Sequence, residues 1–156
     1  MTEPEMTPVF ILLRLLLAGA IGGAFGYERH EHGQPKALGV AGMMLVTIGS
    51  ATYMLFAQYE AVRDPSIVGR TIQSILQGIG FLAGAVIFKG GTSVQGIKTA
   101  TTIWIASAVG LATATDFWWL GLVVGVATFV ILFLTDLSSH RGRQAEDAGS
   151  HGVSNE

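Results

Sequence analysis

Residues 9–26 read VFILLRLLLAGAIGGAFG, an apolar run that contains a single charge, Arg14. A helix of about 20 such residues crosses the roughly 30 Å hydrocarbon core of a bilayer. Charged residues concentrate between such runs, as expected where lipid excludes charge and each helix satisfies its own backbone. The pattern predicts an all-α integral membrane protein, a bundle of five transmembrane helices. The five runs are Val9–Gly26, Leu38–Ala57, Ile67–Phe88, Ile97–Thr113 and Phe117–Thr135.

The composition excludes an ordinary soluble domain. Of the 156 residues, 50% are hydrophobic and 13% are charged, whereas a soluble domain carries about 25% charged residues. The formal charge of −2 provides no basic field for nucleic acid, and the absence of cysteine removes disulfides and thiolate chemistry. The sequence contains no nucleotide-binding loop and no nucleophile elbow. We therefore expect no enzymatic activity, no cofactor and no nucleic-acid partner.

Basic residues are unequally distributed between the two sides of this predicted membrane domain. The N-terminus, the 58–66 loop and the turn around Asp116 carry Arg63, and Arg70 in the next helical turns raises the count to two. The opposite side carries six: Arg29, Lys36, Lys89, Lys98, Arg141 and Arg143. Because the more basic side faces the cytoplasm, we expect the N-terminus outside and the C-terminus in the cytoplasm. Five crossings also require the termini to lie on opposite sides.

These assignments divide the chain into three parts. Residues 1–8 form an extracytoplasmic N-terminus, and their lack of Lys and Arg argues against a cleaved signal peptide. Residues 9–136 form the five-helix membrane domain. Residues 137–156 are rich in small polar and charged side chains, so we expect a disordered cytoplasmic tail.

The third run carries a polar face. Arg70, Gln73 and Gln77 fall at helical spacing on the same side as Gly80 and Gly84. Polar side chains are costly to leave against lipid, so this face is predicted to turn toward protein or a wet cavity. The sequence allows two interpretations of this face. It either fixes the bundle through interhelical hydrogen bonds or lines a functional cavity.

A charged cluster is predicted at the outer end of the bundle. Arg14 of the first run and Asp64, just before the third run, lie at the outer level set by the charge count. An arginine with an acidic partner there would close an outer gate. The alternative is that Arg14 extends to the phosphate headgroups of the lipid.

Glycines recur at spacings that allow close helix packing. In lipid, helices associate through van der Waals contact at small residues, which the small-xxx-small spacing provides. We expect these glycines to pack helices within the chain rather than to form a dedicated dimer interface. They are Gly19 with Gly23, Gly22 with Gly26, Gly80 with Gly84 and Gly121 with Gly125, and Gly78 serves packing as well.

A second polar set lies at the inner end. Glu28 and Arg29 follow the first run, and Lys98 and Thr99 open the fourth. A charged pair at a helix end is more often an interfacial ion pair than an active site. The neighbouring triplet His30-Glu31-His32 lacks the helical pair spacing of a metal motif, so we expect no metal.

Several of these stretches together resemble the MgtC/SapB family of membrane proteins. The resemblance covers about residues 10 to 135 and implies five membrane helices with an outside N-terminus. It also places the chain in the bacterial inner membrane. The matching stretches are Arg14–Gly19, Gly26–Arg29, Asp64–Ser66, Gln77–Ile87, Gly90-Gly91, Val94–Trp104 and Ala108–Ala112.

The sequence departs from this family at the start of the second helix. Family members commonly carry an Arg-Thr-His triplet there, whereas residues 36–43 read KALGVAGM. Any role that depends on that arginine or histidine is therefore not carried over to this chain.

The resemblance implies a regulator of other membrane machinery, linked to magnesium limitation, acid stress or virulence. The alternative is an ion or small-solute transporter or channel, for Mg²⁺ or an anion, with its path along Arg70, Gln73 and Gln77. Mg²⁺ prefers oxygen ligands, but the charges inside the membrane are Arg14 and Arg70. Expected partners are the bilayer, other membrane proteins and a second copy in a homodimer, since five helices lack the two-fold repeat of transporters.

Overall fold

The computed structural model describes residues 7–31, 39–90 and 93–150. It confirms the all-helical prediction and contains one helix for each predicted apolar run. Thr7 and Pro8 illustrate how the sequence starts a helix, because the Phe10 amide donates to Thr7 Oγ1 at 3.4 Å and proline suits the first helical position. The helices are α1 Pro8–Glu31, α2 Val40–Glu60, α3 Ser66–Ala85, α4 Ile97–Thr113 and α5 Trp118–Ser150.

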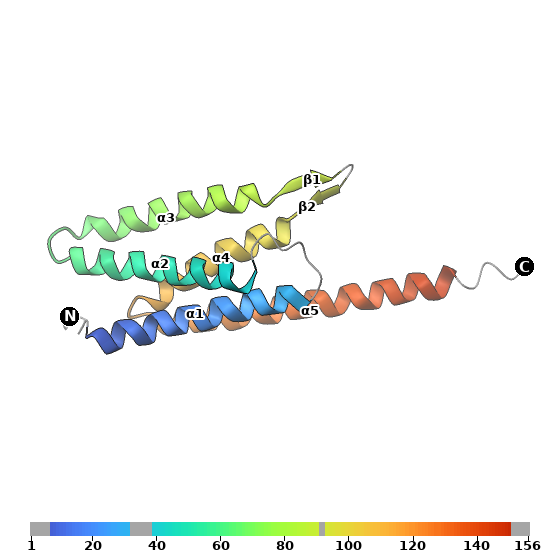
Figure 1. The fold of residues 1–156 in the computed structure, drawn as a ribbon, viewed down its shortest axis with the longest axis horizontal. Helices are drawn as coiled ribbons and strands as arrows, with labels where there is room; N and C mark the ends of the chain where they lie inside the picture. Colours follow the sequence, from blue (N-terminus) through green and yellow to red (C-terminus); the bar gives the residue numbers. More distant parts are fainter. Residues whose placement is uncertain (1–6, 32–38, 91–92, 151–156) are drawn as a thin grey trace, which may run out of the picture.

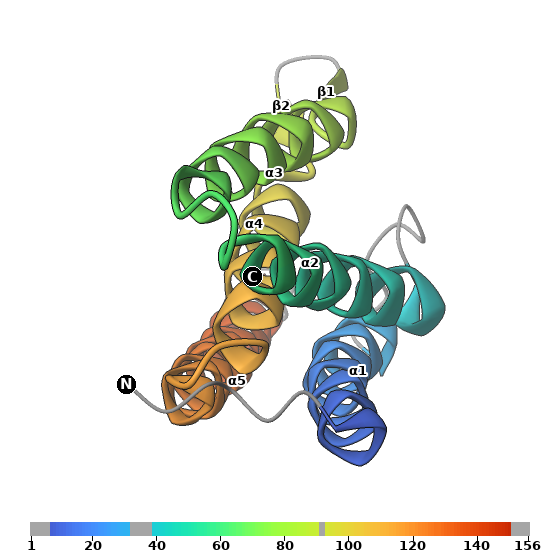
Figure 2. The ribbon, with the colours of Figure 1, turned by 90° about the vertical axis from the view of Figure 1, so that its left-hand side faces the viewer.

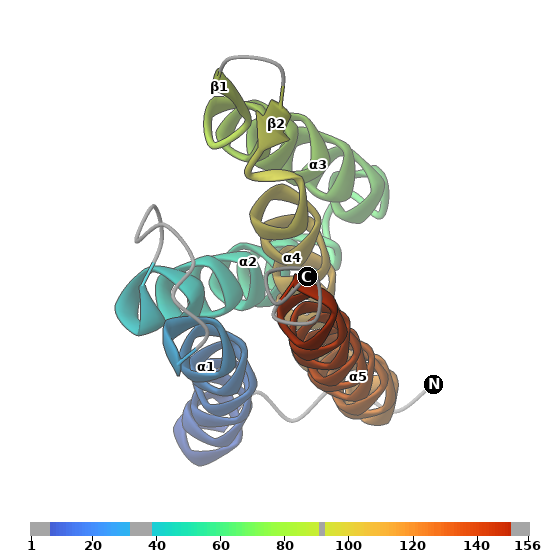
Figure 3. The ribbon, with the colours of Figure 1, turned by 90° about the vertical axis from the view of Figure 1, so that its right-hand side faces the viewer.

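Helix α4 forms the centre of the bundle. It contacts all four other helices, while α1 also contacts α2 and α5. Viewed from either end, α3 lies on the opposite side of α4 from α5 (Figures 2 and 3). Helix α3 contacts only α2 and α4 among the principal helix pairs of the described residues. Much of its surface is therefore left uncovered by the chain itself.

A short hairpin, which the sequence analysis treated as a loop, connects α3 to α4. Strands β1 Phe88–Gly90 and β2 Ser93–Gln95 pair antiparallel, with Lys89 opposite Val94. They project past the end of α3 (Figure 1). Gly96 then turns the chain into α4 with a φ of 88°, where a Cβ would overlap the carbonyl of Val86. Only glycine adopts this conformation without strain.

Helix α5 is longer than predicted. It continues to Ser150 and projects beyond the rest of the bundle (Figure 1), so residues 137–150 are helical where we expected a disordered tail. The physical reason is that an existing helix grows by one hydrogen bond per added residue, without a new nucleation step. Arg, Gln, Glu and Ala in this segment are good helix formers. Residues 151–156 lie outside the described residues.

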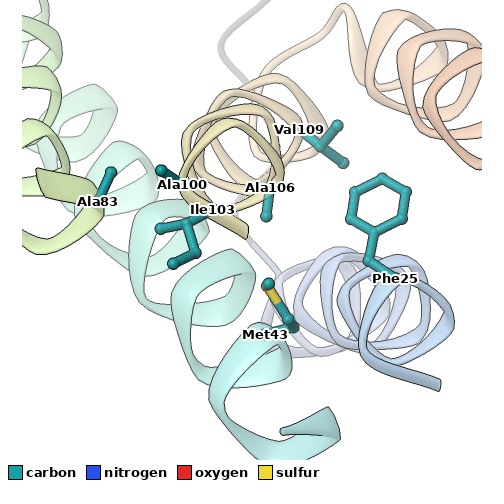
Figure 4. Packing of buried hydrophobic residues seen from close by; sticks show 7 residues of the cluster. All are labelled: Phe25, Met43, Ala83, Ala100, Ile103, Ala106 and Val109. Atoms are coloured by element: carbon teal, nitrogen blue, oxygen red, sulfur yellow. The ribbon is translucent and has the colours of Figure 1, made fainter. Parts of the chain in front are cut away.

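Small side chains dominate the core. One cluster brings Phe25 of α1 and Met43 of α2 onto α4, where they meet Ile103, Ala106 and Val109 (Figure 4). A second cluster joins α1, α2 and the end of α4 through Ala18, Ala51, Met54, Leu55, Leu111 and Ala114. Short side chains bring the helix axes close together, which is how helices associate in lipid.

The outer surface is strongly apolar. Large hydrophobic side chains are exposed on several helices, among them Leu12, Leu16, Phe56, Phe81, Val123 and Ile131. A protein in water does not expose apolar surface so extensively. Three spans in the described residues are long and apolar enough to cross a membrane: Pro8–Glu28, Val40–Glu60 and Trp118–Thr135. Helices α3 and α4 fall outside this set, although both were predicted to cross.

Candidate functional site

The polar face of α3 is exposed. Arg70, Gln73 and Gln77 all lie on the outside of the bundle, together with Gly80 and Gly84. The opposite face packs through its isoleucines and Ala83 against the two core clusters. The helix is therefore amphipathic as the sequence indicated, but its polar face points away from the other helices of the chain.

A groove runs between α2 and α3. Its volume is about 670 Å³, and its lining extends from Leu45 to Tyr53 on α2 and from Ile67 to Leu82 on α3. Arg70 lines this groove, but Gln73 and Gln77 do not. The three predicted polar residues therefore separate into two sites, with the arginine in the groove and the two amides beside it.

The glycines of α3 make no close contact within the described part of the chain. A Cβ added at Gly78, Gly80 or Gly84 would meet nothing within 4 Å. This corrects the expectation that they pack against another helix of the same chain. These glycines do form a surface of small residues on α3. Helices α2 and α4, however, pack against the opposite face of α3, which carries its isoleucines.

Other glycines lie against neighbouring helices. A Cβ at Gly19 would come within 3.1 Å of Ile48, and one at Gly23 within 3.4 Å of Met44. On α5, a Cβ at Gly121 would lie 2.8 Å from Thr113, and one at Gly125 would lie 2.9 Å from Ile21. These four predicted positions are therefore close helix contacts, on α1 with α2 and on α5 with α4 and α1.

The closest approach in the bundle surrounds Thr47. On one side a Cβ at Gly22 would overlap Thr47 Oγ1, and on the other a Cβ at Gly110 would overlap the Thr47 carbonyl oxygen. One turn away, the buried Ser50 and Ser107 hydroxyls form a hydrogen bond of 2.9 Å. Gly110 was not predicted as a packing residue, because it has no glycine four residues away on either side.

Arg14 is buried and has a different partner from the one predicted. It is 6% exposed, and its guanidinium donates to the carbonyl of Thr113 at 3.1 Å, near the end of α4. Its acidic neighbour is Asp116, at 3.6 Å, and its Cζ lies 4.1 Å from the Phe10 ring centroid. A cation at a helix C-terminus also compensates the negative end of the helix dipole. Arg14 therefore ties α1 to the α4–α5 turn.

Asp64 does not pair with Arg14 but accepts a hydrogen bond at the start of α3. Its carboxylate accepts a hydrogen bond of 3.0 Å from the Ser66 amide at the start of α3. Hydrogen bonds from the side chain and backbone of Ser66 hold the pKa of the Asp64 carboxyl below its usual value, and the positive charge of Arg70 adds to this. The predicted outer cluster of Arg14 with Asp64 is therefore corrected, because Asp116 takes the place of Asp64.

We expect Arg14→Leu to lower the free energy of unfolding by about 1.5–3 kcal/mol, because the Thr113 carbonyl loses a charged donor. Asp116→Asn should cost less than about 1 kcal/mol, since its side chain is 81% exposed and exposed ion pairs contribute little. Unfolding in detergent, followed by circular dichroism, measures both. Equal losses would show that the ion pair, and not the bond to the helix end, holds the turn.

The inner polar set gathers at one end of the bundle. Phe25 of α1 and Ala100 of α4 share a core cluster; Glu28 lies three residues after Phe25, and Thr99 directly precedes Ala100. Glu28 is 5% exposed and Thr99 is 3% exposed, while Lys98 is half-buried. The side chain of Arg29 and those of the His30-Glu31-His32 triplet lie outside the described residues. Across the residues that are described, no group of three potential metal ligands occurs.

Comparison with known proteins identifies the family. Residues 15–140, most of the chain, match the MgtC family. The chain belongs to the MgtC family. Within it, the chain is 33% identical to protein SrpB of Synechococcus elongatus over 132 residues, a match that covers 76% of this chain and 71% of SrpB. No solved structure matches the chain.

Two further relatives of this MgtC-family chain are longer. It is 39% identical to protein MgtC of Brucella abortus over 97 residues, which cover 61% of this chain and 39% of that protein. It is 31% identical over 136 residues to the Escherichia coli protein named "Putative magnesium transporter YhiD", with 81% of this chain and 60% of that protein covered. The chain therefore spans well under two thirds of the Brucella relative.

Family and structure together show a bacterial membrane protein. The MgtC match agrees with the apolar surface and the three helices that can span a bilayer. Two features of this MgtC-family chain that packing among the described helices does not explain are the exposed polar face of α3 and the groove beside it.

Proposed function

We propose that this protein regulates magnesium-transport machinery in the bacterial inner membrane, without enzymatic activity, by docking the exposed face of α3 against a partner membrane protein. The docking face comprises Gln73, Gln77, Gly80 and Gly84. The observation that carries the proposal is that this face, with two amides and two glycines, is not covered by the described residues of a chain that exposes many large apolar side chains. The link to magnesium rests on the relative named as a magnesium transporter.

The physics of the bilayer supports a protein partner at this face. An amide group that faces hydrocarbon has no hydrogen-bond partner, so a helix with two amides on one side favours contact with another helix. Gly80 and Gly84 leave room for the backbone of that helix to approach, since nothing within the described chain occupies the space. The combination of small residues and hydrogen-bonding groups is the usual composition of helix interfaces in membranes.

The proposed topology has five crossings, with the N-terminus outside and the C-terminus in the cytoplasm. Helix α4 contacts all four other helices, and its 17 residues are close to the length that a crossing needs. A reporter fused after Arg143 should therefore be active as a cytoplasmic enzyme, since six of the eight counted basic residues lie on that side. A periplasmic signal from the same fusion would refute either the number of crossings or their direction.

Cross-linking tests the docking face directly. The chain has no cysteine, so single substitutions can carry a photoreactive maleimide without background. Gly80→Cys and Gln77→Cys should each link to the same transport protein in membranes, whereas Val123→Cys on the exposed apolar side of α5 should link only to lipid. Adducts between two copies of the chain, or the same products at all three positions, would overturn the proposed docking to a transporter.

The second candidate function is transport itself. It is favoured by the name of the Escherichia coli relative and by the presence of Arg70 in a groove between two helices. Purified protein in sealed liposomes, assayed for Mg²⁺ and anion flux, separates the two functions. Flux that Arg70→Gln removes would support a transport path, while the absence of flux with intact cross-linking at Gly80 would support the regulator.

A further inference from the structure

The groove between α2 and α3 is polar at one end and apolar at the other. The two helices run antiparallel, so the C-terminal part of α2 meets the N-terminal part of α3 (Figure 1). At that end the polar lining residues Tyr53, Arg70, Thr71 and Ser74 lie together with one apolar residue, Ile67. At the far end it consists of Leu45, Val46, Ile79 and Leu82. The lining thus has the same polarity as a lipid molecule, with a headgroup at one end and a chain at the other.

The length of the groove suits a lipid acyl chain. Ile67 and Leu82 on α3 are 15 helical steps apart, which corresponds to about 22 Å at 1.5 Å per step. One leaflet contributes roughly 15 Å of hydrocarbon, so this length takes an acyl chain together with part of its headgroup.

Arg70 provides the charge that selects a ligand. Among the described residues its guanidinium has no hydrogen bond and no salt bridge, and the carboxylate of Asp64 is already bonded to the Ser66 amide. Its five N–H groups match the oxygens of a phosphate in bidentate geometry. A cation that forms no salt bridge with the described residues, at the polar end of an apolar groove, therefore favours an anionic headgroup.

We infer that the α2–α3 groove binds one anionic phospholipid, with its phosphate at Arg70 and an acyl chain along Leu45, Ile79 and Leu82. Tyr53 lies at the headgroup level, where tyrosine is enriched in membrane proteins. This site is separate from the docking face, because Gln73, Gln77, Gly80 and Gly84 do not line the groove.

Two glycines on α3 offer a matched pair of variants. Gly78 lines the groove and Gly80 does not, yet a Cβ at either position meets nothing within 4 Å. Leucine raises helix propensity equally at both sites. Gly78→Leu therefore places a side chain where the acyl chain should lie, while Gly80→Leu leaves the groove open. Arg70→Gln has a similar control in Arg63→Gln, an exposed arginine outside the groove.

Native mass spectrometry of the full chain, released from vesicles of phosphatidylglycerol and phosphatidylcholine, counts the bound lipid. The wild type and both controls should retain one phosphatidylglycerol in preference to phosphatidylcholine. Gly78→Leu should reduce retention of either lipid about tenfold, and Arg70→Gln should abolish the preference, as expected when a charge-assisted hydrogen bond is lost.

Three results would overturn the inference. The first is equal retention of the two lipids by the wild type. The second is equal retention of phosphatidylglycerol by Gly78→Leu and Gly80→Leu. The third is a change in oligomer size, rather than in lipid retention, for Gly78→Leu, because it would make the groove a contact between copies of the chain.

Discussion

Replacing Gly110 by leucine is expected to prevent α4 from packing against α2 and to unfold the centre of the bundle. A Cβ at this position would overlap the carbonyl oxygen of Thr47 and lie 3.0 Å from the Cβ of Ser50. A backbone atom cannot rotate aside as a side chain can, so the two helices must separate. Separation also breaks the 2.9 Å hydrogen bond between Ser50 and Ser107. Overpacking typically costs 1–3 kcal/mol, and we expect about 3 kcal/mol or more here.

The matched control for Gly110→Leu is Gly80→Leu. Both variants place leucine at a helical glycine. A side chain at Gly80 would enter open space, whereas one at Gly110 would meet the backbone of α2. Thermal unfolding in detergent should show a large loss of stability for Gly110→Leu and none for Gly80→Leu. A wild-type unfolding temperature for Gly110→Leu would mean that α2 and α4 do not meet at Thr47.

Replacing both Gln73 and Gln77 by leucine is expected to abolish the biological activity while the protein stays folded. Neither amide has a hydrogen bond with any other described residue, and both are exposed. Their loss therefore removes no contact from the bundle, whereas it converts the proposed docking face into a lipid-facing one. Growth under magnesium limitation measures the activity, and membrane protein level and unfolding temperature measure folding.

Two control variants accompany this experiment, one for growth and one for stability. Thr52→Leu changes an exposed hydroxyl on α2 that bonds only the Ile48 carbonyl of its own helix, at 2.8 Å, and should leave growth unchanged. Gln58→Leu removes the 2.8 Å bond from Gln58 to the Ala114 carbonyl and should lower stability by about 1 kcal/mol. Normal growth of the double variant, at normal protein level, would refute the α3 face as the functional surface. The buried inner set with Glu28 and Thr99 would then be the next candidate.

The helices could be predicted from the sequence because their signals are local. A run of apolar residues near bilayer length, flanked by Thr7-Pro8 or by Asp64-Pro65, sets where a helix begins without reference to the rest of the fold. The hairpin at 88–95 and the extension of α5 to Ser150 were missed. Three-residue strands have too few residues to show a period, and the extension depends on the helix that precedes it.

The partner of Arg14 could not be predicted in the same way. Asp64 and Asp116 both lie on the predicted outer side, and the sequence alone does not rank them. The choice follows from the order of the helices around α4, which brings the α4–α5 turn, and not the start of α3, against α1.

By itself, the sequence determined the membrane character of this MgtC-family protein, its five helices and the polar face of α3, because composition and helical period act within one segment. Only the tertiary structure decided which glycines are covered. Gly22 and Gly110 lie against Thr47, while Gly80 and Gly84 have the same chemistry and face outward. Whether a glycine is covered depends on the neighbouring helix as well as on its own, so it cannot be predicted from one segment. In lipid, moreover, no hydrophobic force draws the helices together. Shape complementarity over the whole bundle therefore selects the packed faces, and the face with Gly80 and Gly84 is not among them.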